Sequence, residues 1–302
     1  MRPATSADGL TNGPFAAYQA RIAALRRSPY MDFPAHVHLE TFAKCNASCS
    51  FCPSEKLERS GARMPDSLIA KILAELTAIP VRFQLSPFKV NEPFLDVRLF
   101  DILELCNRSL PNAGVTLTTN ASPLTDAQLK KLAALRNIGS LFISVNERNP
   151  EAYERVMGIP FARSVDRLKS IHRVVTEGKL QFPVILSRVG DGSAEDQCFT
   201  RWAQENFPRF QSAVFSRGGW LGQVDTTTSY VPAIGCIRWF DLSITATGVV
   251  AHCCMDGMAL YPIGDANRQH LLEIYNSPAY RSLREHALSR LEAAPCKSCG
   301  FL

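Results

Sequence analysis

The sequence of 302 residues predicts an α/β protein in which a parallel sheet curls into part of a barrel, followed by a smaller C-terminal unit. Short β-branched or apolar segments alternate with amphipathic helical segments up to about residue 218, and this alternation stops after Gly222. Strand and helix units in this order favour a parallel sheet, because each helix provides the crossover that two parallel strands require.

Composition restricts the class of protein. With 46% apolar residues, the chain is long enough to bury a substantial core. The net charge of +5 is mild and no block of like charges occurs, so we expect no nucleic-acid partner. The sequence contains neither an apolar stretch of 18 residues nor a secretory signal, which predicts a cytoplasmic protein with no membrane partner.

The first elements cover and build the barrel. Residues 1–14 resemble a loose tail and residues 15–27 an amphipathic helix over an edge, so residues 1–35 are predicted as an N-terminal tail and covering helix. Strands are expected at residues 37–42, 83–88, 115–119, 141–145, 182–186 and 213–215. Helices are expected at residues 66–79, 99–110, 125–135, 150–156, 164–176 and 195–207. Residues 36–222 are therefore predicted to form a partial (β/α)6, TIM-like barrel, whose chemistry lies at the C-terminal ends of the strands.

The C-terminal unit, residues 223–302, begins with a turn-rich and threonine-rich stretch. An apolar hairpin is predicted over residues 242–251 with Thr247 and Gly248 in its turn, and a helix over residues 272–288. This change of pattern predicts a separate, smaller domain.

Ten cysteines are many for a chain in a reducing compartment, and they indicate metal ligation or catalysis. Cys45, Cys49 and Cys52 follow the first predicted strand with C-x3-C-x2-C spacing. Three thiolates can hold a [4Fe–4S] cluster while leaving one iron open to a co-substrate. A zinc site is the alternative, but four ligands in paired C-x2-C spacing would then be expected. Two isolated cysteines, Cys106 and Cys198, are predicted to be ordinary buried residues.

The motif C-x3-C-x-aromatic-C directly after the first strand resembles that of the radical S-adenosylmethionine (radical SAM) superfamily. The resemblance spans about residues 36–218. It implies that the open iron chelates the amino and carboxylate groups of SAM, and that an electron from the cluster splits SAM into methionine and a 5′-deoxyadenosyl radical. That radical abstracts hydrogen from an unactivated C–H bond.

The same resemblance implies SAM contacts at other positions. Phe51 is similar to the residue that packs on the adenine, although loop packing alone also explains it. Residues 90–93 resemble the G-G-E-P motif that receives the SAM amino group, with Asn91 in place of a glycine and Glu92 retained. Ribose and carboxylate contacts are implied at strand ends for Asn120, Ser144 and Arg188. Polar residues at strand ends are also common as caps or turn residues.

A second group of cysteines lies near the C-terminus. Cys236, Cys254, Cys296 and Cys299 form a complete ligand set for an auxiliary [4Fe–4S] cluster or for a structural zinc. The segment resembles the short "twitch" form of the SPASM extension, with C-x17-C, the Gly-Asp of residues 264–265 and a final C-x2-C. This resemblance favours iron–sulfur, and therefore two [4Fe–4S] clusters together with SAM.

Cys253 is left over from both sets. Adjacent side chains on an extended segment point to opposite faces, so we expect one of Cys253 and Cys254 to bind the auxiliary cluster and the other to face the barrel mouth. A thiol S–H bond is weaker than an alkyl C–H bond, so Cys253 could return hydrogen to a substrate radical from the opposite face and invert the carbon. Simple packing is the alternative, and the two cysteines could exchange roles.

The chain thus resembles a radical SAM epimerase acting on a sugar carbon of an aminoglycoside-type small molecule, reduced by an external donor such as flavodoxin or ferredoxin. A twitch-type dehydrogenase that oxidises an aminocyclitol alcohol, a peptide-modifying enzyme, and a non-catalytic iron–sulfur carrier or zinc module are the alternatives. Candidates to line the pocket, all near predicted strand ends, are Glu147, Arg148, Arg188, Arg217 and Trp220. For each charged residue among them, a solvated surface position is the alternative.

Overall fold

The computed structural model describes residues 14–226, 231–286 and 289–300. The predicted tail before residue 14 and part of the threonine-rich stretch lie outside the described residues. Within the described part of the chain, no helix is both long and apolar enough to span a lipid bilayer.

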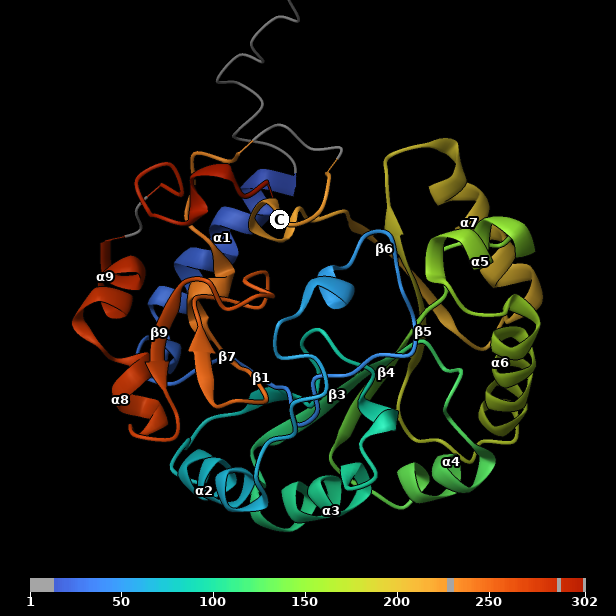
Figure 1. Cartoon of the computed structure of the whole chain (residues 1–302), viewed down its shortest axis with the longest axis horizontal. Coiled ribbons are helices and arrows are strands. Elements are labelled where there is room, and N and C mark those ends of the chain that lie inside the picture. Colours follow the sequence, from blue (N-terminus) through green and yellow to red (C-terminus); the bar gives the residue numbers. More distant parts are fainter. Residues whose placement is uncertain (1–13, 227–230, 287–288, 301–302) are drawn as a thin grey trace, which may run out of the picture.

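One sheet of nine strands organises the molecule, in the order β6-β5-β4-β3-β2-β1-β7-β8-β9. The first six strands pair only in parallel and curve around a central lumen (Figure 1). This confirms the predicted partial barrel. Its strands are β1 (His36–Leu39), β2 (Phe83–Ser86), β3 (Ala113–Thr119), β4 (Ile138–Ser144), β5 (Val184–Gly190) and β6 (Gln211–Ser216).

Six helices follow one another along the outside of the curve (Figure 1). They are α2 (Asp66–Leu76), α3 (Leu99–Ser109), α4 (Asp126–Ala133), α5 (Pro150–Met157), α6 (Phe161–Thr176) and α7 (Ala194–Asn206). Helix α4 begins with a capping box in which the side chains of Thr125 and Gln128 satisfy each other's backbone N–H groups. The main core lies between these helices and the sheet, where Leu117, Leu141 and Leu168 are fully buried.

The two isolated cysteines lie in these helices. Cys106 of α3 is buried, as predicted. Cys198 of α7 is only half-buried, so that prediction is wrong, because α7 packs on the sheet through Phe199 and Ala203 instead.

The C-terminal strands extend the same sheet. Strand β7 (Asp241–Ile244) pairs in parallel with β1, and β8 (Val249–Ala251) and β9 (Pro262–Asp265) follow in antiparallel order. The predicted hairpin is confirmed, with Gly248 at a positive φ of 87° in its turn. Strand β9 was not predicted, because proline and glycine are uncommon inside strands.

The helix predicted over residues 272–288 is wrong. The chain instead forms α8 (Leu271–Tyr275) and α9 (Pro278–His286), and residues 287–288 lie outside the described residues. Pro278 has no backbone N–H and is suited to the first turn of a helix rather than to its interior, so it starts a new helix.

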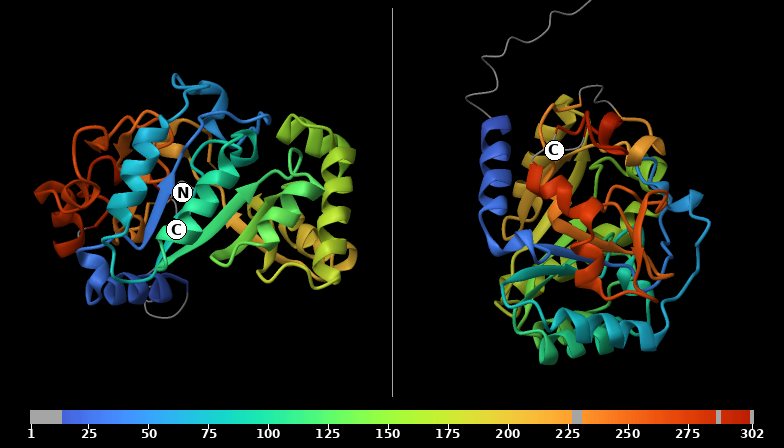
Figure 2. Two further views of the ribbon diagram at one scale, coloured as in Figure 1. Left: turned by 90° about the horizontal axis from the view of Figure 1, so that it is seen from below. Right: turned by 90° about the vertical axis from the view of Figure 1, so that its left-hand side faces the viewer.

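Helix α1 (Pro14–Arg26) covers the segment that carries the later cysteines (Figure 2). It packs against the short 3-10 helix η6 (Ile237–Phe240), and the Tyr18 hydroxyl donates to the Cys236 sulfur over 3.6 Å. The Arg26 guanidinium caps the end of α9 by donating to the Arg284 carbonyl at 2.9 Å.

Candidate active site

The loop with Cys45, Cys49 and Cys52 leaves the C-terminal end of β1, at the rim where barrel chemistry takes place. Helix α5 holds this loop from one side: the Ser48 N–H donates to the Met157 carbonyl at 3.0 Å and the Ser50 N–H donates to the Val156 carbonyl at 2.9 Å. The backbone of the loop is therefore fixed while its three thiols remain half-buried.

Residues after β6 hold the loop from the other side. The indole N–H of Trp220 donates to the Phe51 carbonyl at 2.9 Å, and the Arg217 guanidinium donates to the Ser50 carbonyl at 3.2 Å. These two predicted pocket residues thus lie against the backbone of the cysteine loop.

The three thiols fit a multi-iron cluster better than a single ion. Tetrahedral zinc with Zn–S bonds of about 2.3 Å would bring its sulfurs to about 3.8 Å from one another. Among the described residues, one group of three possible ligand atoms lies within 4.8 Å of one another, and that group contains no cysteine. In a [4Fe–4S] cluster each thiolate binds a different iron, so wider spacing is expected.

Without bound iron these thiols are protonated at neutral pH. Burial raises the pKa of Cys45 to about 11 and also raises the pKa values of Cys49 and Cys52. Neighbouring thiolate charge raises the pKa of Cys45 and Cys49 further. Because the thiolate is the metal ligand, binding of the cluster here releases protons.

Glu92 connects the second and third strand ends. Its buried carboxylate accepts hydrogen bonds from the Thr119 hydroxyl at 2.7 Å and from the Asn120 N–H at 2.8 Å. Burial raises the pKa of Glu92 to about 7, against the effect of these hydrogen bonds. The Asn120 amide also donates to the side chain of Asn46 in the cysteine loop at 3.0 Å. The structure therefore brings Glu92, Asn120 and the cysteine loop together.

Asn91 is buried beside Glu92. Its side-chain oxygen accepts from the Lys89 N–H at 2.9 Å, and its side-chain nitrogen has no hydrogen-bond partner. A buried amide nitrogen of this kind can donate to a ligand in the barrel.

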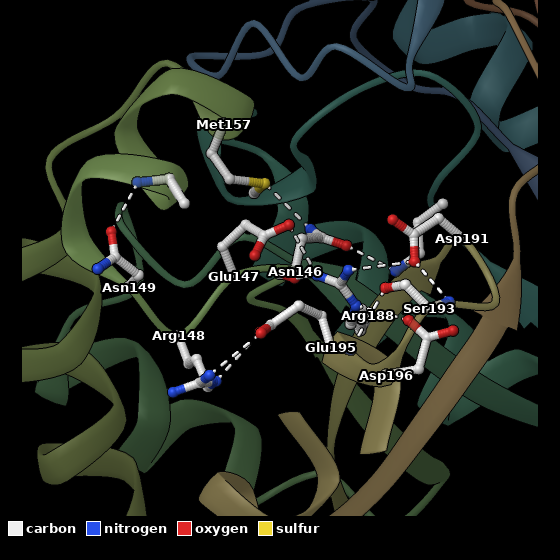
Figure 3. A network of polar contacts seen from close by, with 12 residues as sticks. Asn146, Glu147, Arg148, Asn149, Met157, Arg188, Asp191, Ser193, Glu195 and Asp196 are labelled. Carbon is white, nitrogen blue, oxygen red and sulfur yellow. Dashed lines mark hydrogen bonds and ion pairs between the residues drawn. The ribbon is translucent and has the colours of Figure 1, made fainter. Parts of the chain in front are cut away.

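Arg188 on β5 lies in a network of acidic groups rather than alone (Figure 3). Its guanidinium contacts the carboxylates of Glu147 at 2.7 Å and Asp196 at 2.8 Å, and it also donates to the Asn146 carbonyl. The Ser144 hydroxyl accepts from the Asn146 amide at 2.7 Å, so Ser144 belongs to the same network.

Arg148 lies at the solvent-exposed end of the contacts drawn in Figure 3, and Ser193 and Asp191 separate its partner Glu195 from Arg188. Arg148 is exposed and paired with Glu195 at 3.1 Å (Figure 3). Of the predicted pocket residues on this side, the structure thus brings Glu147 and Arg188 together and leaves Arg148 on the surface.

The auxiliary cysteines lie near one another, since the charge of Cys236 raises the pKa values of Cys254 and Cys296 and that of Cys299 raises the pKa of Cys296. Cys236 and Cys296 are buried in one apolar cluster with Trp239 and Phe240. The Cys296 sulfur lies 3.4 Å from Nε2 of His252, a neighbour that sequence reasoning missed. Burial lowers the pKa of His252 to about 4, so its ring is neutral.

Cys253 and Cys254 begin a turn rather than continuing an extended segment, as the 3.1 Å hydrogen bond from the Asp256 N–H to the Cys253 carbonyl indicates. The extended backbone from which the alternation of faces was predicted is therefore wrong at these two residues. Negative charge at Cys236 raises the pKa of both thiols, so both lie near the auxiliary cysteines.

Lys89 is a site residue that sequence reasoning missed. Its fully buried ammonium donates to the Ser243 hydroxyl at 2.9 Å and to the Cys253 carbonyl at 3.3 Å. Burial lowers its pKa, and the nearby charges of Glu40 and Cys253 raise it. The only signal in the sequence was a lysine directly after the second predicted strand and directly before the motif of residues 90–93.

Comparisons with known proteins agree with this geometry. Residues 39–195 match the family model described as the Radical SAM superfamily, and residues 236–300 match SPASM, an iron–sulfur cluster-binding domain. No curated protein matches the sequence significantly.

Solved structures of BtrN, SuiB and anSMEcpe share the fold at low sequence identity. The structure of BtrN in complex with AdoMet and 2-DOIA is 16% identical, with a TM-score of 0.62 over 89% of this chain and 94% of that chain. Streptococcus suis SuiB bound to precursor peptide SuiA is 17% identical, with a TM-score of 0.69 over 96% of this chain and 75% of that chain. The structure of anSMEcpe with bound AdoMet is 13% identical, with a TM-score of 0.59 over 85% of this chain and 80% of that chain.

The cofactors follow from these matches. A radical SAM match implies a [4Fe–4S] cluster and SAM, and a SPASM match implies auxiliary iron–sulfur binding, so the cofactors are SAM and two [4Fe–4S] clusters. The radical SAM match covers just over half of the chain, and the barrel and cysteine loop have the arrangement expected for it. The chain belongs to the radical SAM superfamily and carries a C-terminal SPASM domain.

Proposed function

We propose that the chain is a radical SAM epimerase that inverts a sugar carbon of an aminoglycoside-type small molecule. The observation that supports this proposal is the position of Cys253. This residue is only 8% exposed, and its backbone carbonyl accepts a hydrogen bond from the buried Lys89 ammonium. The same segment of chain carries Cys254, which we assign to the auxiliary cluster together with Cys236, Cys296 and Cys299. Cys45, Cys49 and Cys52 are assigned to the SAM-binding cluster.

When bound, the first cluster and SAM supply a 5′-deoxyadenosyl radical that removes one hydrogen atom from the substrate carbon. Cys253 then returns a hydrogen atom to the opposite face of that carbon, and its sulfur keeps the unpaired electron. One electron and one proton restore the thiol. The electron would come from an external donor such as flavodoxin or ferredoxin, and the auxiliary cluster that Cys236, Cys254, Cys296 and Cys299 would hold could pass it on.

The remaining assignments concern binding. Phe51, Asn91, Glu92, Asn120, Ser144 and Arg188 are proposed as SAM-binding residues. The chain resembles neomycin C epimerase in its length, in the short extension without further cysteines and in the extra Cys253. This resemblance supports an aminoglycoside substrate.

Turnover in heavy water tests the proposal. We expect one deuterium at the reacting carbon of a product whose oxidation state is unchanged. Cys253→Ala should still release 5′-deoxyadenosine but give no inverted product. The matched control is Cys198→Ala, which removes a half-buried thiol in α7 and should leave inversion intact. Inverted product from Cys253→Ala would contradict the assignment of the hydrogen donor.

A dehydrogenase acting on an aminocyclitol alcohol is the second candidate. It is supported by the shared fold with BtrN in complex with AdoMet and 2-DOIA, which this chain matches over nearly the full length of both. In that case the substrate carbon loses a second electron and becomes a carbonyl, so the product of the same incubation carries no deuterium at that carbon. A carbonyl product would reject the epimerase proposal and support the dehydrogenase.

Peptide modification is the third candidate, supported by the shared fold with SuiB bound to a precursor peptide. The chain matches 75% of that protein, so a quarter of the SuiB chain has no counterpart in the match. Release of 5′-deoxyadenosine that depends on a peptide, and not on an aminoglycoside, would support this candidate.

A further inference from the structure

Three potential metal ligands converge inside the barrel, away from both cysteine groups. His36 and His38 are two residues apart on β1 and so share one face of the strand. The intervening Val37 packs into the core between the sheet and its outer helices, so both histidines face the lumen. Asp241 on the neighbouring β7 pairs in register with His36. One ligand atom from each of the three side chains lies within 4.8 Å of the other two.

His38 lacks a partner in this group. The ring is 7% exposed, and its Nε2 has no hydrogen-bond partner. The backbone of Phe88 is hydrogen-bonded to the ring, and burial lowers the pKa of His38 well below its ordinary value. The ring is therefore neutral with its N–H directed at Phe88, and Nε2 carries a lone pair.

That lone pair faces a second acceptor. Nε2 of His38 lies 3.7 Å from the Asp241 carboxylate, which is too long for a hydrogen bond even if the carboxylate is protonated. The Asp241 carboxylate accepts from Arg238, but Nε2 of His38 is a buried acceptor without a donor, which costs free energy on the order of 1–3 kcal/mol. A cation between them would remove this cost.

The surroundings support the ligands in the way usual for metal sites. The ring of His36 is kept neutral by burial, which lowers its pKa to about 2, and its Nε2 lies 2.8 Å from the Ser86 hydroxyl. Ligating side chains are generally oriented by such outer partners. A cavity of about 970 Å³ at the N-terminal ends of the strands is lined in part by His36 and Asp241, so it gives an ion a path to the site.

Three positive charges near the site oppose a metal ion: those of Arg238 and Lys89 act on His38, and those of Arg238 and Arg21 act on Asp241. The Arg238 guanidinium donates to the Asp241 carboxylate at 3.2 Å. A carboxylate has about four lone-pair positions, so Asp241 can accept this hydrogen bond and still bind an ion.

We propose that His36, His38 and Asp241 bind one Zn²⁺ in the barrel lumen. Two imidazoles and one carboxylate are a common zinc donor set and leave a fourth position for water. The site contains no thiolate, so it is chemically distinct from the two iron–sulfur sites. Because its ligands come from β1 and β7, the ion ties the barrel to the strand that leads into the auxiliary-cluster segment.

The test uses holoenzyme reconstituted with iron and sulfide, then given one equivalent of ZnSO4 and passed through gel filtration with a weak chelator. We expect about one zinc per chain. X-ray absorption at the zinc edge should give nitrogen and oxygen neighbours at about 2.0–2.1 Å and no sulfur at about 2.3 Å. His38→Gln and Asp241→Asn should lose this zinc, whereas the matched control His286→Gln, at the exposed end of α9, should retain it. Iron, sulfide and SAM cleavage should be unchanged in His38→Gln.

Four results would overturn the proposal. They are the absence of zinc from the wild-type holoenzyme, sulfur neighbours in the X-ray absorption spectrum at the zinc edge, retention of zinc by His38→Gln, and binding of a ninth iron in place of zinc. If His38→Gln fails to fold, the zinc spectrum of the wild type decides alone. None of these results depends on whether the enzyme is an epimerase.

Discussion

Replacing Arg188 by methionine tests whether its guanidinium serves the acidic network on β5 or SAM. The side chain is 4% exposed and contacts the carboxylates of Glu147 and Asp196 at 2.7 and 2.8 Å. Arg188→Met keeps much of the apolar volume but leaves both carboxylates without their cation. We therefore expect a large loss of stability even in the absence of SAM.

The magnitude follows from the burial of the network. Removing one partner of a buried ion pair costs about 3–5 kcal/mol, and the lower end applies here because Glu147 and Asp196 keep side-chain exposures of 19% and 17%. Asp191, at 3.7 Å and 42% exposed, adds little. Arg188→Lys keeps the charge but cannot bond both carboxylates at once, so about 1.5–3 kcal/mol is expected.

Denaturant unfolding of the anaerobically reduced, cluster-free chain measures these changes, and equilibrium binding of SAM to the holoenzyme measures the second role. Asp196→Asn removes one of the two carboxylate charges that Arg188→Met leaves unpaired. The loss in free energy of unfolding of the double variant should therefore be smaller than the sum of the two single losses by at least about 1 kcal/mol. Additive costs, or a loss below about 1 kcal/mol for Arg188→Met, would refute the structural role. SAM binding that stays weak after stability is recovered would support direct contact between Arg188 and SAM.

Three further changes probe the site. Gly158→Ala should lower the iron content from about eight to about four per chain. Gly158 has a φ of +68°, and an added Cβ would lie 1.9 Å from a serine hydroxyl of the cysteine loop. Gly178→Ala is the control, because Gly178 has a similar φ of +70° but no atom within 4 Å of an added Cβ. Lys89→Met should lower the ratio of inverted product to 5′-deoxyadenosine at least several-fold, because the Cys253 carbonyl loses its hydrogen-bond donor. Lys89→Arg should recover part of that ratio. An unchanged ratio in Lys89→Met would contradict the role of Lys89 in positioning Cys253. The pKa of Glu92 rises from 4.5 to about 7 on folding, so the contribution of Glu92 to stability is full below about pH 4.5 and is lost as the pH rises through about 7. Glu92→Gln should therefore reduce the pH dependence of the melting temperature of the cluster-free chain over this range. An identical slope of melting temperature against pH would refute the assignment.

The barrel could be predicted from local sequence because the spacing of apolar residues along the chain differs between strands and helices. Six parallel strands and their helices appeared at nearly the predicted positions, and the hairpin turn at Gly248 was marked by its glycine. Elements built against local preference were not predictable in this way. Strand β9 contains proline and glycine and exists because β8 pairs with it, and Pro278 divides a helix whose apolar pattern continues across it.

The site was predictable where ligands follow one another in sequence and unpredictable where strands bring them together. The cysteine motifs and Glu92 could be recognised from spacing. Lys89 became visible only when β7 placed Ser243 beside it and the turn after β8 placed Cys253 there, and that turn includes the hydrogen bond from the Asp256 N–H. The pairing of His36 with Asp241 requires the register between β1 and β7, which no local pattern indicates.

The parallel pairing of β7 with β1 limits how this enzyme can be recombined with its relatives. A chimera that exchanges only the segment after β7 would have to match a foreign hairpin to the existing edge, whereas a junction between β6 and η6 transfers β7 together with its hydrogen-bonding register. Such a graft must also bring a compatible first strand, because each side chain on β7 meets a fixed neighbour on β1. Exchange of reaction outcome between members of this superfamily therefore requires the two strands to be moved as a pair.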